Sequence, residues 1–282
     1  MIHDAVSSVS YFSQPALPKA EPQDLARVVD ILHKRAGIVL GDHKRDMAAR
    51  TLGLRSHHSG LDSVRDYLNL LEQNPQAEEW DRFISAFTIN HTAFFREQHH
   101  FQILADFVRT RRKPISVWCC ASSTGEEPYT LAMTLHDACG QSDVGISVLA
   151  TDIDVQALAQ ARKGVYTLDR IKPVPPEFLR RYFLRGTGRQ AGMAMVKPVI
   201  RNLVTFDELN LVAPVWPVNQ KFDAIFCRNT MIYFDKPTQT RILDRFVPLL
   251  KSGGLMFAGH SENFTYLTKS LRLRGQTVYE LA

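Results

Sequence analysis

Apolar residues in the first part of the chain recur at the spacing of amphipathic helices. After residue 24, four of them fall on one face of a helix: Leu25, Val28, Val29 and Leu32. Two later stripes repeat this spacing: Val64, Tyr67, Leu68 and Leu71, and then Trp80, Phe83, Ile84 and Phe87. Gly37 can end the first helix, Asp42 can cap a second that continues to about Leu54, and Asp62 or Ser63 can cap the third. The pattern predicts a small all-helical domain over residues 23–87.

The second part of the chain alternates short apolar runs with helical segments. The runs are rich in strand formers and cover residues 115–121, 146–151, 222–227 and 254–258. Helical segments follow three of them, at residues 129–138, 155–162 and 238–250. This alternation is typical of βαβ units and predicts a mainly parallel sheet covered on both faces. The last residues, LRLRGQTVYELA, alternate like an antiparallel edge hairpin.

Two segments depart from these patterns. Residues 180–206 contain β-prone runs around a glycine turn at Gly186, Gly188 and Gly192, and we expect a small antiparallel β insertion there. Residues 1–22 lack periodicity and carry three prolines, which predicts a flexible N-terminal arm. The expected fold class is α/β. A parallel sheet that ends in an antiparallel hairpin is typical of the Rossmann-like domain of S-adenosylmethionine-dependent methyltransferases, here preceded by a small all-α domain.

The composition is that of a soluble globular protein. The 282 residues are 45% hydrophobic and 22% charged, which excludes a disordered or fibrous chain. No apolar run approaches the ~18 residues of a membrane span, and the N-terminus lacks the pattern of a signal peptide, so we expect a cytoplasmic protein. The four cysteines have no zinc-site spacing, which predicts free thiols and no metal: Cys119, Cys120, Cys139 and Cys227.

Candidate chemistry lies in the loops that follow the predicted strands, where open α/β sheets bind ligands. After the first strand, Gly125 lets the backbone approach a ligand at the head of a helix. The adjacent Glu126 and Glu127 would repel a phosphate and suit a cation such as the ammonium or sulfonium group of S-adenosylmethionine. Complementing the helix dipole explains the same two residues, and both explanations stay open.

Two further strand ends carry polar side chains. After the second strand, Asp152 occupies the place where doubly wound folds hold ribose hydroxyls, whereas Asp154 is better explained as the N-cap of the next helix. After the later strand come Arg228, Asn229 and Tyr233. Without further information, these residues are better explained by structure: Arg228 and Asn229 as a pair that stabilises the loop, and Tyr233 as a core residue. In the connecting segment, residues 88–96, Phe94 and Phe95 are expected to seal the seam between the domains.

Five motifs in order then give a recognisable pattern: TxNxTxFFRE, ASSTGEEPY, TDID, CRNxMIYF and GHSENF. From about residue 24 to its end, the chain resembles the chemotaxis receptor methyltransferases, the CheR family. The resemblance implies methylation of glutamate side chains of chemoreceptors to γ-methyl esters, with S-adenosylmethionine as cofactor, S-adenosylhomocysteine as product and no metal. It implies a linker over residues 88–96 that contributes to the cofactor site and a methyltransferase domain over residues 97–282.

The resemblance also assigns roles to residues. The implied cofactor contacts are Asn90, Thr92, Arg96, Glu127, Asp152, Asn210, Leu211, Arg228 and Asn229. Asn210 and Leu211 rest on the resemblance alone. The glycine turn, Gly186, Gly188 and Gly192, is implied to bind the C-terminal tail of a receptor.

A physical argument then predicts the catalytic residues. A glutamate of pKa ~4.3 is ionised at neutral pH and needs no general base to attack a methyl sulfonium, so the task is to position it. We expect Arg96 to orient the substrate carboxylate through its planar fork and Tyr233 to supply a further hydrogen bond.

The positive charge has a definite location. The chain holds 34 Lys and Arg against 29 Asp and Glu, a net +5, which permits nucleic acid, an acidic membrane surface or an acidic protein as partner. Residues 33–59 hold six basic and two acidic residues, a local +4. A solvated helix face explains this surplus, but beside a carboxylate-methylating site it predicts a docking surface for acidic receptor helices, with these contacts: Lys44, Arg45, Arg50 and Arg55. The membrane would be approached only through receptors.

Two other functions fit part of the sequence. A nucleic-acid methyltransferase fits the basic charge, but an Asn/Asp-Pro-Pro-Tyr motif is absent from the segment that begins at Asn229, and no RNA-binding motif is present. A non-catalytic protein that senses S-adenosylmethionine would not need Arg96 and Tyr233. His99, His100 and His260 are expected to be surface, seam or loop residues rather than metal ligands or part of a hydrolase site.

Overall fold

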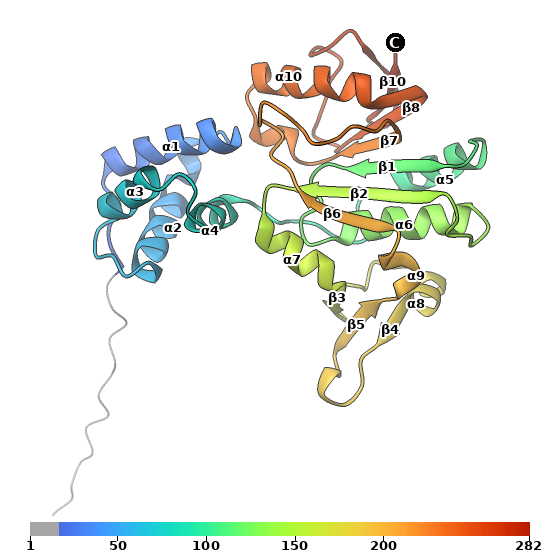
Figure 1. The fold of residues 1–282 in the computed structure, drawn as a ribbon, viewed down its shortest axis with the longest axis horizontal. Coiled ribbons are helices and arrows are strands. Elements are labelled where there is room, and N and C mark those ends of the chain that lie inside the picture. Colours follow the sequence, from blue (N-terminus) through green and yellow to red (C-terminus); the bar gives the residue numbers. More distant parts are fainter. Residues whose placement is uncertain (1–16) are drawn as a thin grey trace, which may run out of the picture.

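The computed structural model describes residues 17–282, so the first sixteen residues of the expected arm lie outside the described part of the chain. The predicted helical domain is present as four helices, seen beside the sheet in Figure 1: α1 (Pro22–Ala36), α2 (Arg45–His58), α3 (Val64–Gln73) and α4 (Glu79–Phe87). The predicted apolar stripes form its core, with Leu32, Tyr67 and Phe83 fully buried. As predicted, Gly37 ends α1 in the left-handed region and Ser63 caps α3.

The start of α2 differs from the prediction. Asp42 opens a short 3₁₀ helix, Asp42–Lys44, and its carboxylate pairs with Arg45 at 2.8 Å instead of capping α2. The helix also continues past Leu54 to His58, because Leu52 and Ser56 are buried on its inner face and hold this end against the domain core.

The part of the expected arm that the structure describes is packed. Gly53 of α2 faces residues 17–18, and a Cβ added there would lie 2.6 Å from the carbonyl oxygen of Pro18. Ala20 packs against the core of the helical domain. Over residues 17–21 the expectation of a flexible arm is therefore wrong, because a glycine in α2 lets the backbone approach closely.

The larger domain is built on a seven-stranded sheet with the order β6-β2-β1-β7-β8-β10-β9. The strands are β1 (Ile115–Cys119), β2 (Ile146–Asp152), β6 (Val204–Glu208), β7 (Phe222–Cys227), β8 (Leu250–Ala258), β9 (Leu271–Gly275) and β10 (Val278–Leu281). The first five strands in this order pair in parallel, and β10 pairs antiparallel with both β8 and β9, as the tail pattern predicted. The strand order reverses between β1 and β7, which is where such sheets bind ligands.

Helices cover both faces of this sheet. They are α5 (His99–Arg109), α6 (Glu126–Ala138), α7 (Val155–Lys163) and α10 (Lys236–Phe246). Val117 and Cys119 belong to the apolar core with α5 and α6, whereas Trp118 between them belongs to the core with α10. Successive side chains of β1 point to opposite faces of the sheet and therefore contribute to two different apolar cores. Helix α10 ends four residues before the predicted end, because Pro248 lies in a 3₁₀ turn and Leu250 already pairs with Phe222.

A second, three-stranded sheet projects from the larger domain (Figure 1) and has the order β3-β5-β4. It contains β3 (Val165–Thr167), β4 (Phe183–Arg185) and β5 (Met193–Val196), with the short helices α8 (Pro176–Tyr182) and α9 (Pro198–Arg201) beside it. The pairing is antiparallel, as expected, but the sheet does not coincide with residues 180–206. It includes β3, and it excludes β6, which pairs with β2 because Val204 and Phe206 complete the main core.

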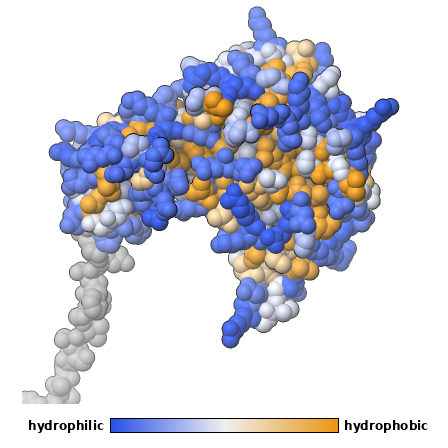
Figure 2. Space-filling model, in the orientation of Figure 1, coloured by the Kyte–Doolittle hydropathy of each residue, from blue (hydrophilic) through white to orange (hydrophobic). Residues whose placement is uncertain are grey.

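Other expectations concern single features. All four cysteines are free thiols, as predicted. Within residues 17–282, no group of acidic, histidine or cysteine side chains has the arrangement of a metal site. No described helix is long and apolar enough to cross a membrane. Hydrophilic residues cover most of the face shown in Figure 2, with apolar residues gathered over the larger domain and near its junction with the helical domain.

Candidate active site

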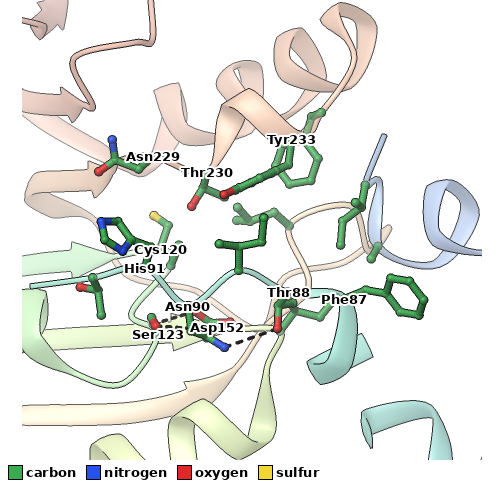
Figure 3. Close-up of a pocket in the computed structure, with 18 of the residues that line it drawn as sticks. Phe87, Thr88, Asn90, His91, Cys120, Ser123, Asp152, Asn229, Thr230 and Tyr233 are labelled. Carbon is green, nitrogen blue, oxygen red and sulfur yellow. Dashed lines mark hydrogen bonds between the residues drawn. The ribbon is translucent and has the colours of Figure 1, made fainter. Parts of the chain in front are cut away.

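A pocket lies where the helical domain, the linker and the carboxyl ends of β1, β2 and β7 meet (Figure 3). All nine side chains implied to contact the cofactor line it: Asn90, Thr92, Arg96, Glu127, Asp152, Asn210, Leu211, Arg228 and Asn229. Tyr233 and Lys44 line it as well. The structure thus brings together residues spread over most of the sequence, because the ends of neighbouring parallel strands meet at one edge of the sheet.

Asp154 joins the two domains at the rim of this pocket. It caps α7, as predicted, through the backbone N–H groups of residues 156 and 157. The same carboxylate accepts hydrogen bonds from Ser85 Oγ at 2.5 Å, Thr88 Oγ1 at 2.7 Å and Asn90 Nδ2 at 2.7 Å. Asn90 Oδ1 in turn accepts from Ser123 Oγ at 2.7 Å (Figure 3). The linker is therefore fixed to the loops that follow β1 and β2, a role that the sequence did not indicate.

The phenylalanines of the linker pack differently from the prediction. Phe94 is buried against Tyr166 and Phe183 of the small sheet. Phe95 packs on Phe101 and on Phe178. Neither ring seals the seam between the domains. The linker turns with a positive φ at Phe95, and both rings pack in the core of the larger domain.

Arg228 is the buried cation of the site. Its fully buried guanidinium pairs with Glu97 at 3.1 Å and with Glu127, and it donates to the carbonyl oxygen of Arg96 at 2.5 Å. Burial alone would raise the pKa of Glu97, but Arg228 and the surrounding hydrogen bonds hold that pKa below its ordinary value. Two carboxylates share one guanidinium, so the cluster carries a net negative charge beside the pocket and suits a cationic ligand.

The two glutamates after Gly125 have different surroundings. Glu126 is fully buried and pairs with Arg170, away from the pocket. Glu127 lines the pocket, with one oxygen toward Arg228 and the other 3.4 Å from the Cys119 sulfur. Because thiols are weak donors, this second oxygen keeps the capacity to accept a hydrogen bond from a ligand.

Asp152 lies at the end of β2 and is almost fully buried. Its two oxygens accept backbone N–H groups, from Ser123 at 2.7 Å and from Asp154 at 2.8 Å. Burial raises the pKa of Asp152 to about 6, against the opposite effect of these hydrogen bonds. Since a carboxylate has about four lone-pair positions, it can still accept hydroxyl donors from the pocket.

The loop after β7 places a phenol beside two cations. Tyr233 ends a 3₁₀ helix, Met231–Tyr233, and its carbonyl oxygen accepts the N–H of Val39 from the helical domain at 2.8 Å. Burial raises the pKa of Tyr233, while Arg96 acts in the opposite direction, so the phenol is a neutral donor at pH 7. The Lys44 ammonium lies 5.3 Å from the centre of its ring. Arg96 itself donates to the carbonyl oxygen of His91 at 2.7 Å and lines the pocket.

The residues expected to dock a receptor divide into two groups. Lys44 is at the pocket, and Arg45 and Arg50 are exposed on α2. Arg55 is instead turned into the helical domain, where its Nε donates to Glu79 at 3.0 Å and only 17% of its side chain is exposed. Its assignment to a docking surface is wrong, because the inner face of α2 carries this guanidinium as the partner of a carboxylate.

The glycine turn lies at the tip of the small sheet (Figure 1), and none of its residues lines the pocket. Gly188 and Gly192 have φ of +56° and +89°, in the left-handed region. A Cβ added at Gly186 would lie 2.1 Å from the carbonyl oxygen of Gln190. The glycines are therefore required by the backbone of the turn, whatever binds there.

Both domains of the chain are similar to known proteins. The family model for the S-adenosylmethionine-binding domain of CheR methyltransferases matches residues 90–279, and the model for their all-alpha domain matches residues 23–88. A chemotaxis protein methyltransferase of Salmonella typhimurium is 52% identical over 256 residues, which cover 91% of this chain and 89% of the relative. The corresponding protein of Escherichia coli is also 52% identical, over 91% of this chain and 90% of the relative. Chemotaxis protein methyltransferase 2 of Pseudomonas aeruginosa is 45% identical, over 92% of this chain and 93% of the relative. The chain belongs to the CheR methyltransferase family.

Proposed function

We propose that this protein transfers the methyl group of S-adenosylmethionine to glutamate side chains of chemoreceptors and so acts in chemotaxis. The observation that carries the proposal is the meeting of Arg96 and Tyr233, two donors for a substrate carboxylate, with Glu127 and Asp152 in one pocket. The relatives named above are chemotaxis protein methyltransferases. A sensor without catalysis and a nucleic-acid methyltransferase are not favoured by these names.

The pocket suits the cofactor by charge. Glu127 belongs to the cluster of two carboxylates and one guanidinium, which favours an ammonium or sulfonium group. Asp152 has remaining lone pairs that would accept the ribose hydroxyls of the bound cofactor, and Leu211 and Asn210, which also line the pocket, would hold its adenine through an apolar and a polar contact. When bound, S-adenosylmethionine supplies the methyl group on a positively charged sulfur.

The substrate glutamate needs positioning more than activation. Its carboxylate is ionised at neutral pH, so no general base is required, and holding it in line with the methyl group can supply several kcal/mol of the barrier, up to about 7–11 kcal/mol. Arg96 provides a planar pair of donors and Tyr233 a neutral hydroxyl donor, while Lys44 adds positive charge beside the ring. Together they favour a carboxylate over a neutral acceptor.

The ionisation of Asp152 gives a testable pH dependence. Its pKa is raised to about 6, so the ionised form that accepts both ribose hydroxyls is present above that pH and is lost below it. We expect the affinity for S-adenosylhomocysteine, measured by calorimetry, to fall as the pH is lowered through about 6. Asp152→Asn is expected to bind more weakly at pH ~7.5 and to lose this dependence. If the affinity of the wild-type protein for S-adenosylhomocysteine changed with pH no more than that of the variant, Asp152 would not have this role.

The exposed face of α2 is proposed to dock the methylated helices of a receptor. Arg45 and Arg50 are exposed there next to Met47 and Leu54, which are 42% and 37% exposed, and Met47 also lines the pocket. A face with both apolar and basic residues fits an amphipathic acidic helix. Because these charges are exposed, binding should weaken strongly as salt is raised.

The small sheet is proposed to hold the C-terminal tail of a receptor. Within residues 17–282 the edge strand β4 pairs only with β5, so an extended peptide can pair on its other side, and Arg185 and Arg189 are exposed beside the glycine turn. A receptor without its last few residues is expected to bind roughly tenfold more weakly or worse, as measured by calorimetry. Gly186→Ala should abolish the difference between full-length and truncated receptors and leave S-adenosylhomocysteine binding unchanged. Equal affinity of both receptors for the wild-type protein would remove this role.

The proposed reaction can be tested by transfer of a tritiated methyl group. Receptor-containing membranes, nucleic acid and a mixture without acceptor are compared under the same conditions. Counts that appear on the receptor alone and are released by base support a methyl ester. Base-stable counts on nucleic acid, or no transfer to any acceptor, would contradict the proposal in favour of one of the two other functions.

A further inference from the structure

Glu262 is a buried carboxylate next to the pocket that the proposed reaction does not use. It lies in the loop after β8, within the motif GHSENF, and only 4% of the residue is exposed. It does not line the pocket, and no basic side chain within residues 17–282 forms an ion pair with it. A buried carboxylate is costly unless hydrogen bonds compensate for the loss of water, so its partners indicate its role.

Four backbone N–H groups donate to this one carboxylate. Oε2 accepts from Gly259 at 2.6 Å and from Asn229 at 2.9 Å, while Oε1 accepts from Thr230 at 2.9 Å and from Met231 at 2.7 Å. Three of these donors belong to the loop after β7, which carries the pocket residues Asn229 and Tyr233. The carboxylate therefore connects the loops that follow two neighbouring parallel strands.

The loop that it holds has a tightly packed turn. Asn229 has a φ of +56°, in the left-handed region that asparagine adopts more readily than most non-glycine residues. Gly259 packs so closely that an added Cβ would lie 2.4 Å from Nδ2 of Asn229 and 2.8 Å from its backbone nitrogen. The bond from Met231 N–H to Glu262 fixes the first residue of the 3₁₀ helix that ends at Tyr233. Without the carboxylate, four N–H groups would lose their partner and the tightly packed turn would lose its support.

We propose that Glu262 is a positioning residue that holds Asn229 and Tyr233 in the arrangement needed for methyl transfer. It acts through backbone groups and contacts neither substrate nor cofactor. All of its acceptor positions are directed at backbone donors, so it does not serve as a base. The effect on turnover rests on the proposed function, whereas the effect on the loop and on ligand binding does not.

The test compares Glu262→Gln with Glu280→Gln. Glutamine keeps the shape of the side chain but places an NH₂ group against backbone donors. Glu280 is a carboxylate of β10 that pairs with Arg272 and Arg274 and serves as the matched control. At a temperature well below its Tm, Glu262→Gln is expected to lose about 100-fold in kcat for the receptor with little change in KM. It should bind S-adenosylhomocysteine about tenfold more weakly. Glu280→Gln should have the kcat, the KM and the S-adenosylhomocysteine affinity of the wild type.

Hydrogen exchange supplies a readout independent of activity. We expect Glu262→Gln to lose protection in peptides that contain residues 229–231, while Glu280→Gln keeps it. If the wild-type protein failed to methylate any receptor, the proposed function would fail, and loss of protection together with weaker S-adenosylhomocysteine binding would still support the role of Glu262. A Glu262→Gln variant with a lower Tm but wild-type kcat, ligand affinity and protection would overturn the inference, as would equal losses in Glu280→Gln.

Discussion

Replacing Arg228 with Met is expected to lower the free energy of unfolding by about 3–5 kcal/mol, the cost of leaving buried carboxylates without their cation. The guanidinium is fully buried and pairs with both Glu97 and Glu127, whose side chains are 8% and 11% exposed. Removal of the cation forces two neighbouring negative charges to remain in a site of low polarity or to take up a proton. Urea denaturation monitored by circular dichroism measures this change, and calorimetry should show a large loss of affinity for S-adenosylhomocysteine.

The control for this prediction is Arg272→Met. Arg272 pairs with Glu280, but 72% of its side chain is exposed, so its loss should change the free energy of unfolding by less than about 1 kcal/mol. If the two variants were equally stable, the buried cluster would not contribute to the fold as described. A stable Arg228→Met variant that also bound the ligand normally would contradict the proposed role of the cluster in the cofactor site.

Replacing Arg96 with Ala is expected to reduce kcat for receptor methylation by roughly 10²–10³-fold, the usual effect of removing a donor directed at a reacting group. Arg96 lines the pocket and is held at one nitrogen by the carbonyl oxygen of His91. Arg96→Lys keeps the charge but lacks the planar fork, so it should recover only part of the rate. Initial rates of tritiated methyl transfer at saturating cofactor measure the effect.

An exposed arginine at the opposite end of the sheet serves as the control for Arg96. Arg112 lies just before β1, away from the carboxyl ends of the strands, and Arg112→Ala should transfer methyl groups at the wild-type rate. Tyr233→Phe should lose less activity than Arg96→Ala because it removes one neutral donor. Arg96→Ala with wild-type turnover and unchanged cofactor binding would show that the substrate carboxylate is oriented by other groups.

Two kinds of sequence pattern predicted most of the structure: the periodicity of apolar residues and the polar residues that follow strands. Apolar stripes predicted three of the four helices of the small domain, because burial of one helix face is what stabilises them. The helix α2 carries no such stripe and was predicted only from the residue expected to cap it. The polar residues after β1, β2 and β7 met in one pocket because parallel strands bring their carboxyl ends together. Asn210 follows β6 in the same way, but the β-prone run of this strand, Val204–Glu208, comes soon after the glycine turn and by its pattern alone resembles a strand of the insertion.

Other features could not be predicted from local patterns. The local surplus of basic residues placed Arg55 on a docking surface. The residues around Arg55 in the sequence do not show that its partner, Glu79, faces it from another helix. Strand β3 has only three residues, too few to show alternation. Asp154 and Glu262 act through contacts with segments distant in the sequence, and Glu262 binds backbone groups that no side-chain motif reveals.

Mass spectrometry of receptor peptides after incubation with the protein and S-adenosylmethionine tests the central claim most directly. We predict that glutamate side chains of the receptor gain the mass of one methylene group, that mild base removes this mass as methanol, and that Arg96→Ala yields little of the product. Added mass that resists base, added mass on residues other than glutamate, or equal modification by Arg96→Ala would contradict the assignment of this pocket to glutamate methyl-ester formation.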